Sequence, residues 1–386
     1  MGIKIIWWFC IFVIFEAMIG YPLSLYLLDK IMKKPEITKN RKFEPTVTVM
    51  VVAHNEEKVI KDKLDNLVEL DYPIDKLKIL VASDFSTDRT NEIVEDYIKN
   101  HRMIEIYKHE SVQHFGKTNA QNEAQKFVDS EILVMTDANA MFEKNAIREL
   151  VACFVDESVA YVCGRLKYIN EGKNSTANSE GIYWKLDLMC RDIESRFQSI
   201  TAGNGAIYAC RNSEYIDIEP IKCHDSVFPR LYTLQGKKAI YNKEAIAYEK
   251  AGENNEDEFK RKVRMNREIL RGILPDVRIL NVFRYRWYSY FYFGHRTCRY
   301  LLWITHLLVY GLNILLLGQS LWWTLTWIMQ TIFYVLAAIG WKTKSSNRWI
   351  KMVTYYCMTV LAQWYGVYNM LTGKSKAVWE KAESTR

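Results

Sequence analysis

Apolar and polar positions follow two different patterns along the chain. Residues 5–28 and three stretches near the C-terminus, at 301–317, 321–341 and 349–371, are almost continuously apolar, whereas residues 45–275 are mixed. Because a helix of about 20 apolar residues crosses a bilayer, the apolar stretches predict membrane helices. The mixed middle predicts a folded domain with polar surfaces.

Short apolar runs rich in β-branched residues alternate with amphipathic segments in this middle region. The runs predict strands at 46–53, 78–82, 104–107 and 132–135, and the intervening periodicity predicts helices at 59–69, 90–100 and 118–128. Ser86 or Thr87 is expected to cap the second helix. Because strands that alternate with helices form parallel sheets, we predict an α/β domain that binds its ligand beyond the carboxyl ends of its strands.

The first apolar stretch predicts an uncleaved membrane anchor over residues 1–30. It is longer than the core of a signal peptide and has no small-residue cleavage site. Lys30, Lys33 and Lys34 follow it, which predicts that its C-terminal end lies on the cytoplasmic side. Glu16 lies in mid-span, so we expect it to face other helices or water, or to be protonated.

The last hundred residues predict a membrane-associated region. Residues 280–300 mix aromatic side chains with arginines and predict an amphipathic segment on the membrane surface. Residues 301–371 predict two to three transmembrane or re-entrant helices, followed by a basic tail at 372–386. Three full spans would put the basic tail outside, against the positive-inside tendency, so we expect one of them to be re-entrant or interfacial.

Charge and cysteine content narrow the class of protein. The chain has 386 residues, a formal net charge of +7 and eight cysteines. The cysteines form no C-x-x-C pair and no metal-type spacing, which favours a reducing compartment over a disulfide scaffold. Basic residues cluster beside the apolar stretches, as at a cytoplasmic membrane face, and no sequence signature predicts a nucleic-acid partner.

The segment Asp137-Ala138-Asn139 follows the apolar run at 132–135. A carboxylate and a carboxamide in this arrangement are hard oxygen ligands of the kind that Mg²⁺ or Mn²⁺ takes when it carries a diphosphate. A strand-end turn with polar caps explains the same residues without a metal. Polar clusters at 54–57 and 84–88 also follow predicted strands, which favours a ligand site at this edge of the sheet.

Asp84 and Lys117 are candidate contacts to a nucleotide. After a strand, the carboxylate of Asp84 can accept hydrogen bonds from a nucleobase imide or a ribose hydroxyl, or it can cap the following helix. Lys117 follows Gly116 at a predicted helix start, where it can neutralise a phosphate or be an ordinary surface lysine.

Asp225 is the best candidate for a general base, because a carboxylate near a helix start can take a proton from an acceptor hydroxyl. An N-cap aspartate is the alternative. Arg261, Arg264 and Arg267 recur every third residue and fall near one helical face. Such a face can hold a diphosphate, be solvated or contact the membrane.

Taken in order, these motifs resemble those of a membrane-integrated family 2 glycosyltransferase with a GT-A fold. The matching segments are VAHNEE at 52–57, SDFSTD at 83–88, GKTNA at 116–120, TDANA at 136–140, GNGAIYA at 203–209, HD at 224–225 and RKVR at 261–264. Segments 294–296 and 373–379 also resemble the C-terminal half of that family. Each motif is weak, but their order and spacing make the set specific.

The resemblance implies a donor site. Glu56 and Asp84 would contact a uridine, and Lys117 would contact the base or the phosphates. Asp137, with Asn139, would occupy the metal-binding D-x-D position.

The resemblance also implies an acceptor site and a catalytic base. Gly203–Ala206 would line the acceptor channel, and Asp225 would match the catalytic aspartate of the T/E-D motif. Arg264 would match the arginine of the Q-x-x-R-W motif, which holds the leaving diphosphate.

Three departures from the family pattern change the expectation. Asn139 replaces a second acid and removes one charge from the metal site, and Phe85 stands where the family often has glycine. Arg261 and Met265 replace the glutamine and the tryptophan of Q-x-x-R-W. Because that tryptophan helps to form the acceptor site of processive synthases, its absence favours the addition of one sugar, or a few.

We therefore predict an inverting glycosyltransferase in exopolysaccharide or cell-surface glycan synthesis. Its expected partners are a nucleotide-diphospho-sugar, UDP-linked by the resemblance, Mg²⁺ or Mn²⁺, membrane lipids and a lipid-linked or glycan acceptor, with no nucleic acid. The catalytic domain, at 45–275, is expected on the cytoplasmic side of the inner or plasma membrane. The alternatives are a processive synthase that translocates its polymer, a non-catalytic nucleotide-sugar-binding protein and a nucleotidyltransferase.

Overall fold

The computed structural model describes residues 1–32, 36–109, 113–169, 175–250, 255–343, 345 and 347–378. Lys33, Lys34 and residues 379–386 of the predicted basic tail lie outside this part of the chain. The chain forms two compact units. The sheet unit comprises Lys34–Ile169, Arg191–Ala251 and Lys376–Arg386, and the helical unit comprises Met1–Lys33, Asn170–Cys190 and Gly252–Ser375. The domain boundaries expected from the sequence stay predictions.

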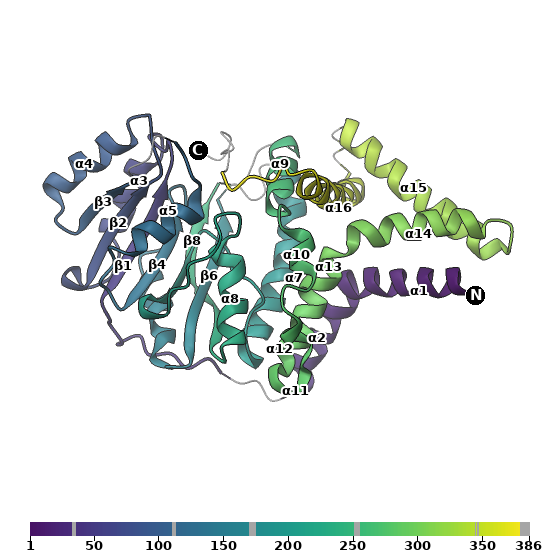
Figure 1. The fold of residues 1–386 in the computed structure, drawn as a ribbon, viewed down its shortest axis with the longest axis horizontal. Coiled ribbons are helices and arrows are strands. Elements are labelled where there is room, and N and C mark those ends of the chain that lie inside the picture. The colour runs from purple at the N-terminus through teal and green to yellow at the C-terminus, as the bar shows by residue number, and fades with distance from the viewer. Residues whose placement is uncertain are drawn as a thin grey trace. The chain divides into compact units, whose positions relative to one another are not determined.

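The sheet unit contains one eight-stranded sheet in the order β3-β2-β1-β4-β7-β6-β8-β5 (Figure 1). Its strands are β1 (Val47–Ala53), β2 (Leu77–Ser83), β3 (Ile104–Lys108), β4 (Ile132–Asp137), β5 (Met141–Phe142), β6 (Val159–Tyr168), β7 (Tyr208–Arg211) and β8 (Lys238–Glu249). Strands β1 to β4 are parallel, as is the pair of β6 and β8. β7 is antiparallel to β4 and β6, and β5 is antiparallel to β8. The predicted α/β class with a mostly parallel sheet is confirmed.

Helices connect the parallel strands where periodicity predicted them. The helices of the sheet unit are α3 (Ile60–Val68), α4 (Thr90–Asn100), α5 (Lys117–Gln125), α6 (Ala146–Val151) and α8 (His224–Leu234), with short 3₁₀ turns at Ile74–Lys76, Ala152–Val155 and Asn212–Glu214. All of β1 is buried, as expected of a strand covered on both faces. Alternate β1 residues pack in one core with Ile60, Leu64 and Leu67 of α3.

The predicted cap of α4 is wrong. Neither Ser86 nor Thr87 accepts a bond from the first turn. Instead, a carboxylate oxygen of Asp88 accepts the Thr90 N–H at 2.9 Å. Ser86 and Thr87 are used elsewhere, because both bond to Asn55. Asp88, two residues before the helix, therefore caps the Thr90 N–H, for which the sequence predicted the hydroxyl of Ser86 or Thr87.

The helical unit contains the predicted anchor and the C-terminal helices. Its elements are α1 (Gly2–Phe15), a π-helix (Glu16–Gly20), α2 (Tyr21–Ile31), the larger part of α7 (Ser175–Phe197), α9 (Asn255–Met265), α10 (Ile269–Ile273), a 3₁₀ turn (Val277–Leu280), α11 (Val282–Tyr285), α12 (Trp287–Tyr292), a π-helix (Phe293–Thr297), α13 (Cys298–Tyr300), α14 (Leu302–Leu316), α15 (Leu321–Thr343) and α16 (Arg348–Leu371). Glu16 faces another helix, because the Tyr290 hydroxyl of α12 donates to its carboxylate at 3.2 Å.

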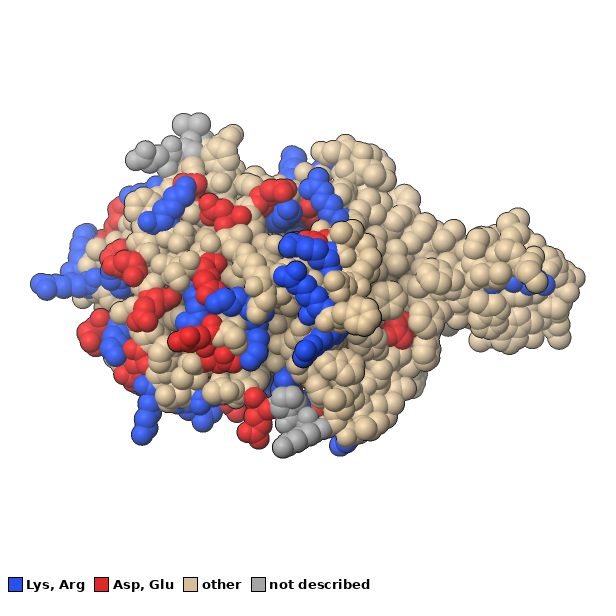
Figure 2. All heavy atoms as spheres, turned by 60° about the horizontal axis from the view of Figure 1, so that its bottom comes forward, with Lys and Arg blue, Asp and Glu red and all other residues tan. Residues whose placement is uncertain are grey.

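Two helices of the described residues are long and apolar enough to cross a membrane. They are Gly2–Ile31 and Leu321–Thr343. A third span arises if Trp287–Tyr300 and Leu302–Leu316, which meet at a bend of 58°, count as one. In the view of Figure 2, charged side chains gather over the sheet unit and few lie where α1, α14 and α15 stand in Figure 1. Candidate spans therefore lie at both ends of the chain, as predicted.

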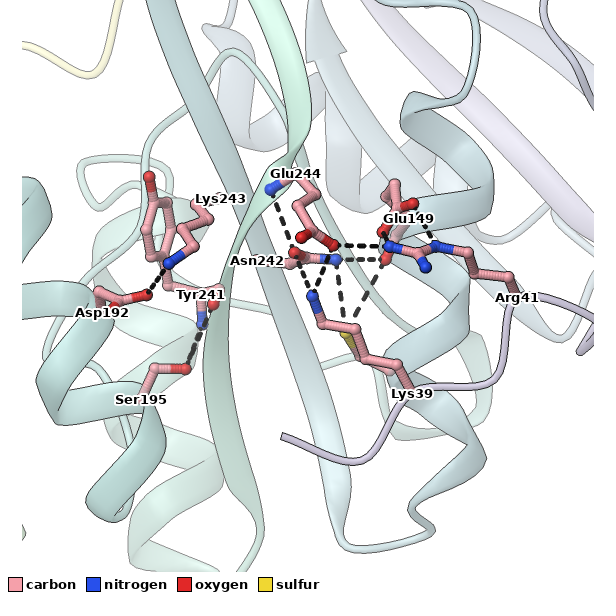
Figure 3. Close-up of polar contacts among 10 residues, drawn as sticks. Lys39, Arg41, Glu149, Asp192, Ser195, Tyr241, Asn242, Lys243 and Glu244 are labelled. Atoms are coloured by element: carbon pink, nitrogen blue, oxygen red, sulfur yellow. Dashed lines mark hydrogen bonds and ion pairs between the residues drawn. The ribbon is translucent and has the colours of Figure 1, made fainter. Parts of the chain in front are cut away.

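The segment that leads into β1 is fixed to the far end of the sheet by charged side chains (Figure 3). Lys39 donates to Asn242 at 2.8 Å and to Glu244 at 3.0 Å. Arg41 donates to Glu149 of α6 at 2.6 Å and to Glu244 at 2.8 Å. Residues 39–41, α6 and β8 are therefore held as one body.

Candidate active site

The polar clusters that follow the strands meet at one edge of the sheet. In the parallel register, Ala53 of β1 lies beside Ser83 of β2, and Val52 lies beside Asp137 of β4. The residues that follow β1 and β2 and the last residue of β4 therefore share the carboxyl edge. Asp137 is itself the end of β4 rather than a residue beyond it.

Asp84 holds the loop that precedes α5. Its side chain is fully buried and accepts hydrogen bonds from Phe115 N at 3.1 Å and Gly116 N at 2.7 Å. It also pairs with His114, whose ring stacks on that of His54 with centroids 3.8 Å apart. Burial alone raises the pKa of Asp84, but these hydrogen bonds outweigh it and hold the pKa below its ordinary value. Asp84 is thus an ionised anchor of the loop, and its contact with a nucleobase stays a prediction.

Glu56 lies in a tightly folded loop at the same edge. The Glu56 N–H donates to Thr90 Oγ1 at 2.8 Å, and its side chain is buried. Its neighbour Asn55 has a φ of 55°, and its side-chain oxygen accepts the Thr87 N–H at 2.7 Å. The fold presents this loop beside Asp84, while a contact between Glu56 and a nucleotide stays a prediction.

Lys117 and Asp137 form an ion pair at the centre of this edge. Lys117 is the first residue of α5, and its ammonium donates to Oδ1 of Asp137. Burial lowers the pKa of Lys117, but the charge and hydrogen bond of Asp137 exceed this effect and raise it above its ordinary value. A β-carbon on Gly205 would lie 3.2 Å from Lys117 Nζ and 3.4 Å from Asp137 Oδ2. The loop that contains Gly205 therefore passes directly beside the pair.

Asp225 lies in the first turn of α8, near the same ion pair. Its carbonyl accepts the Gly203 N–H at 2.7 Å, which fixes the glycine loop to the start of the helix. Burial raises the pKa of the Asp225 carboxyl, and the positive charge of Lys117 opposes the rise. A carboxyl with a raised pKa in a polar site is suited to taking a proton.

The predicted acceptor loop is rigid. A β-carbon on Gly203 would overlap the Tyr161 hydroxyl, so the position requires glycine. Asn204 donates to the Gly164 carbonyl at 2.8 Å and accepts from Ala206 N at 3.1 Å. The lining of an acceptor channel by this loop stays a prediction.

Asp137 and Asn139 fit a divalent cation that carries a diphosphate. The described residues hold no group of three or more His, Cys, Asp or Glu side chains that would bind a metal by themselves. A cation here would therefore take most ligands from phosphate and water, as Mg²⁺ does. Asp137 already holds a positive charge, that of Lys117. Asn139 Nδ2 donates to Glu249 at 2.8 Å, so its carboxamide oxygen is the atom it would offer.

Arg264 lies in α9 of the helical unit and is partly buried. In the same helix Arg261 bonds to the buried Glu258 at 2.7 Å, and the Lys262 ammonium lies 4.7 Å from the ring centroid of Tyr355. At least part of this basic face is therefore structural. The role of Arg264 toward a diphosphate stays a prediction.

Several residues of the site were not singled out from the sequence. The ring nitrogens of His224 each lie 2.9 Å from a side-chain oxygen of α5, Oε1 of Gln121 and Oδ1 of Asn122. These contacts hold the start of α8 on α5. Asp225 in α8 is therefore close enough to Lys117 in α5 to feel its charge. In the sequence His224 stands out only as the neighbour of Asp225. Its contacts join helices that are distant in the chain, and such contacts leave no local sequence pattern.

The C-terminal segment also reaches this edge. A β-carbon on Gly116 would lie 2.8 Å from the carbonyl oxygen of Ala377. Gly116 has a φ of +104°, which favours glycine on backbone grounds as well. The loop before Lys117 is therefore shaped by both its own backbone and a segment from the end of the chain.

Comparison with known proteins identifies the family of the region that contains most of these residues. Residues 48–214 match the model of the glycosyl transferase family 2. The chain therefore contains a family 2 glycosyltransferase domain, which spans Glu56, Asp84, Lys117 and Asp137.

Curated relatives match over the same region. The chain is 35% identical over 142 residues to the "Probable glycosyltransferase YdaM" of Bacillus subtilis (strain 168), a match that covers 36% of this chain and 34% of that protein. It is 30% identical over 143 residues to a "Beta-monoglucosyldiacylglycerol synthase" of Synechocystis, covering 37% of this chain and 30% of that protein. The matches thus span about a third of the length of these relatives.

The fold is similar to that of a solved glycosyltransferase over nearly its whole length. The structure is "Mannosyltransferase PcManGT from Pyrobaculum calidifontis in complex with GDP-Man and Mn2+", with a TM-score of 0.69, 19% sequence identity and coverage of 96% of this chain and 99% of that one. This likeness shows the predicted GT-A fold.

Proposed function

We propose that the protein is an inverting glycosyltransferase that moves a sugar from a nucleotide-diphospho-sugar to a membrane-associated acceptor. The observation that carries the proposal is the ion pair of Lys117 and Asp137, set at the carboxyl edge of parallel strands next to Asp225. At this edge an ammonium can donate to the diphosphate of a nucleotide, and an acid can bind the cation that the diphosphate carries.

Asp225 is the general base of this proposal. Its carboxylate takes the proton of an acceptor hydroxyl, and the hydroxyl oxygen forms a bond to the anomeric carbon of the donor. The bond from that carbon to the diphosphate oxygen breaks on the opposite face, so the configuration inverts and a nucleoside diphosphate leaves. Because a raised pKa makes the carboxylate a stronger base, the burial of Asp225 favours the proton transfer.

Lys117 stabilises the charge that develops on the leaving diphosphate. Its ammonium is held at the edge of the sheet by Asp137, where it can donate to a phosphate oxygen of a bound donor. Asp137 and Asn139 would hold Mg²⁺ or Mn²⁺, which would supply Lewis-acid stabilisation of the same charge when bound. The resemblance of 261–264 to the family motif supports Arg264 as a further contact of the diphosphate.

The donor base is proposed to be uracil, with Glu56 and Asp84 as its contacts. The resemblance of 52–57 and 83–88 to the family motifs supports this choice. The mannosyltransferase of similar fold carries GDP-Man and Mn²⁺, which supports a nucleotide-sugar donor and a divalent metal without selecting the base.

The acceptor is proposed to be a lipid-linked saccharide or a cell-surface glycan. Candidate spans lie on both sides of the family 2 domain in the sequence, and relatives include a synthase of a glycosylated diacylglycerol. We place the domain on the cytoplasmic face of the inner or plasma membrane, where nucleotide sugars occur.

Processive synthesis is a second candidate within the same class. Met265 in place of tryptophan argues against it, and product length in reconstituted vesicles separates the two. A non-catalytic nucleotide-sugar-binding protein would show no turnover, and a nucleotidyltransferase would release pyrophosphate.

Asp225→Asn tests the assignment of the base. The variant should lose roughly 10²–10⁴-fold of the transfer rate, because the amide cannot accept the proton, while its affinity for the nucleotide sugar stays within about twofold. Asp129→Asn is the matched control, since Asp129 is exposed and pairs with Lys78 on the surface. Normal turnover by Asp225→Asn would refute the assignment.

A further inference from the structure

Lys63 is a charged residue in the core of the sheet unit. It lies in the middle of α3, and its side chain is fully buried. A buried ammonium is unfavourable unless polar groups surround it, so its partners indicate what it is for. The sequence gives no warning of this burial, because lysine is ordinarily a solvent-facing residue of an amphipathic helix.

The partners of Lys63 lie at the two ends of one short turn. Its ammonium donates to Thr136 Oγ1 at 3.1 Å and to the carbonyl of Ala140. Between them lie Asp137, Ala138 and Asn139, the segment proposed to hold the donor-bound cation. The turn is closed by the Ala140 N–H, which donates to the carbonyl of Asp137 at 3.2 Å. Lys63 therefore bridges the residue before Asp137 and the residue after Asn139.

The same contact reaches the acceptor loop. The Thr136 hydroxyl that accepts from Lys63 donates to the carbonyl of Ala206 at 2.7 Å. Ala206 follows Gly205, whose position borders Lys117 and Asp137. One hydroxyl thus joins Lys63, the end of β4 and the glycine loop.

A second residue of α3 acts on the strand after the turn. Asn66 lies three residues after Lys63, on the same helical face. Its side-chain oxygen accepts the Phe142 N–H at 2.7 Å, and its nitrogen donates to the Phe142 carbonyl at 2.9 Å. The Phe142 ring in turn lies 4.1 Å from the Lys63 ammonium, measured to its centroid. α3 therefore holds residues 136–142 at several points.

The buried charge is also coupled to the acid of the turn. Burial lowers the pKa of Lys63 to about 7, and the negative charge of Asp137 acts in the opposite direction. The carboxylate of Asp137 therefore favours the charged form of Lys63.

We propose that Lys63 is a positioning residue that sets the geometry of the Asp137–Asn139 turn for the nucleotide-bound cation. It touches neither the cation nor the donor, and it acts through the two ends of the turn. This inference rests on the proposed function of the turn as the donor-metal site.

The test compares Lys63→Met with Lys61→Met in the full-length protein. Methionine keeps most of the volume of lysine and removes the ammonium. Lys61 lies on the same helix, is exposed and pairs with Asp65 at 2.8 Å, so it serves as the matched control. Titration calorimetry measures the binding of UDP, and of GDP in parallel, with and without Mn²⁺.

Lys63→Met should weaken the Mn²⁺-dependent binding of the nucleotide at least tenfold, with metal-free binding changed less than twofold. Lys61→Met should bind as the wild type does. A merely structural role predicts equal losses with and without Mn²⁺, and unchanged Mn²⁺-dependent binding would also overturn the proposal.

Hydrogen exchange gives an independent readout. Peptides that cover 132–142 should exchange at least fivefold faster in Lys63→Met than in Lys61→Met, even if the wild type binds neither nucleotide. That last result would reject the proposed donor but not the positioning role, whereas unchanged exchange would reject the positioning role itself.

Thr136→Val covers the case in which Lys63→Met does not fold. This variant keeps the lysine and removes the hydroxyl that links it to Ala206. It should weaken Mn²⁺-dependent nucleotide binding about three- to tenfold. Wild-type binding and exchange in a folded Thr136→Val protein would overturn the proposal.

Discussion

Single residues at the carboxyl edge of the sheet determine the electrostatics of the site. Lys117 lies between two acids, bonding to Asp137 and acting through its charge on Asp225. Burial raises the pKa of Asp225, the charge of Lys117 lowers it, the charge of Asp137 raises it and that of Arg191 lowers it, so their balance sets the pH at which the base is ionised.

This balance predicts the pH dependence of transfer. Only the carboxylate form of Asp225 can take a proton, so kcat/KM should fall as pH drops through a pKa above the ordinary 3.8 of an aspartate. In Lys117→Met the opposing charge is lost, and the acidic limb should move to higher pH. Profiles of kcat/KM against pH for the two proteins measure the shift.

Lys126→Met is the control for that profile, because Lys126 follows the same helix but is exposed and pairs with Glu123. An acidic limb that stays at the same pH in Lys117→Met would show that another group sets it.

The candidate residues of the site could be singled out from the sequence one at a time, but the residues that support them could not. Asp84, Lys117, Asp137 and Asp225 stand out because an acid or lysine after an apolar run lies at a strand or helix end. Lys63 does not, since a lysine within an amphipathic helix is typical of a solvent-facing position. Its burial follows from tertiary contacts with β4, which a local pattern does not contain.

At the scale of elements, the first half of the sheet was predictable and the second half was not. Strands β1 to β4 are apolar runs that pair in parallel, and β1 to β3 are each followed by a helix that periodicity predicts. β8 contains exposed charges at Lys243 and Glu244, and it pairs with strands far away in the sequence. Nonlocal pairing and mixed exposure remove the local signal.

The contacts in Figure 3 predict where the stability of this half resides. Asn242 is buried, donates to the Glu149 carbonyl at 2.7 Å and accepts from Lys39. Asn242→Leu leaves that carbonyl without its partner, at a cost of about 1–3 kcal/mol. For a unit of this size, the midpoint of thermal unfolding should fall by roughly 2–10 °C.

Lys39→Met should change the same midpoint much less. Its ion pair with Glu244 is solvent-exposed, and such pairs contribute about 0–1 kcal/mol. The oxygen of Asn242 that accepts from Lys39 also accepts the Glu244 N–H at 3.1 Å, so it keeps a partner in this variant. Equal losses in both variants would mean that the ion pair, rather than the buried amide, holds the segment to the sheet.

At the scale of the whole molecule, a sheet unit that contains the family 2 glycosyltransferase domain is combined with an apolar helical unit in one chain. The predicted interfacial segment carries exposed apolar side chains, with Leu280 at 63% and Phe283 at 94% of full exposure. Arg284 and Arg286 lie beside them in the sequence. Apolar groups flanked by arginines are typical of a segment that rests on an anionic membrane.

Phe283→Glu should therefore affect the acceptor and not the donor. Transfer to a lipid-linked acceptor in vesicles with anionic lipid should fall several-fold, because a carboxylate disfavours the interface, while nucleotide binding stays unchanged. Phe127→Glu, at an exposed phenylalanine of the sheet unit, is the control. Equal transfer by wild type and Phe283→Glu would exclude this segment from membrane contact.

We propose that the edge containing Lys117, Asp137 and Asp225 transfers a sugar from a nucleotide-diphospho-sugar. The direct measurement is a donor screen with the purified protein in lipid vesicles, with and without Mn²⁺, in which both the released nucleotide and the glycosylated product are identified. We predict release of a nucleoside diphosphate in equal amount to the sugar transferred, with inverted anomeric configuration, and loss of both products in Asp225→Asn. Release of pyrophosphate, or a product that retains the donor configuration, would show that this edge does not catalyse inverting sugar transfer.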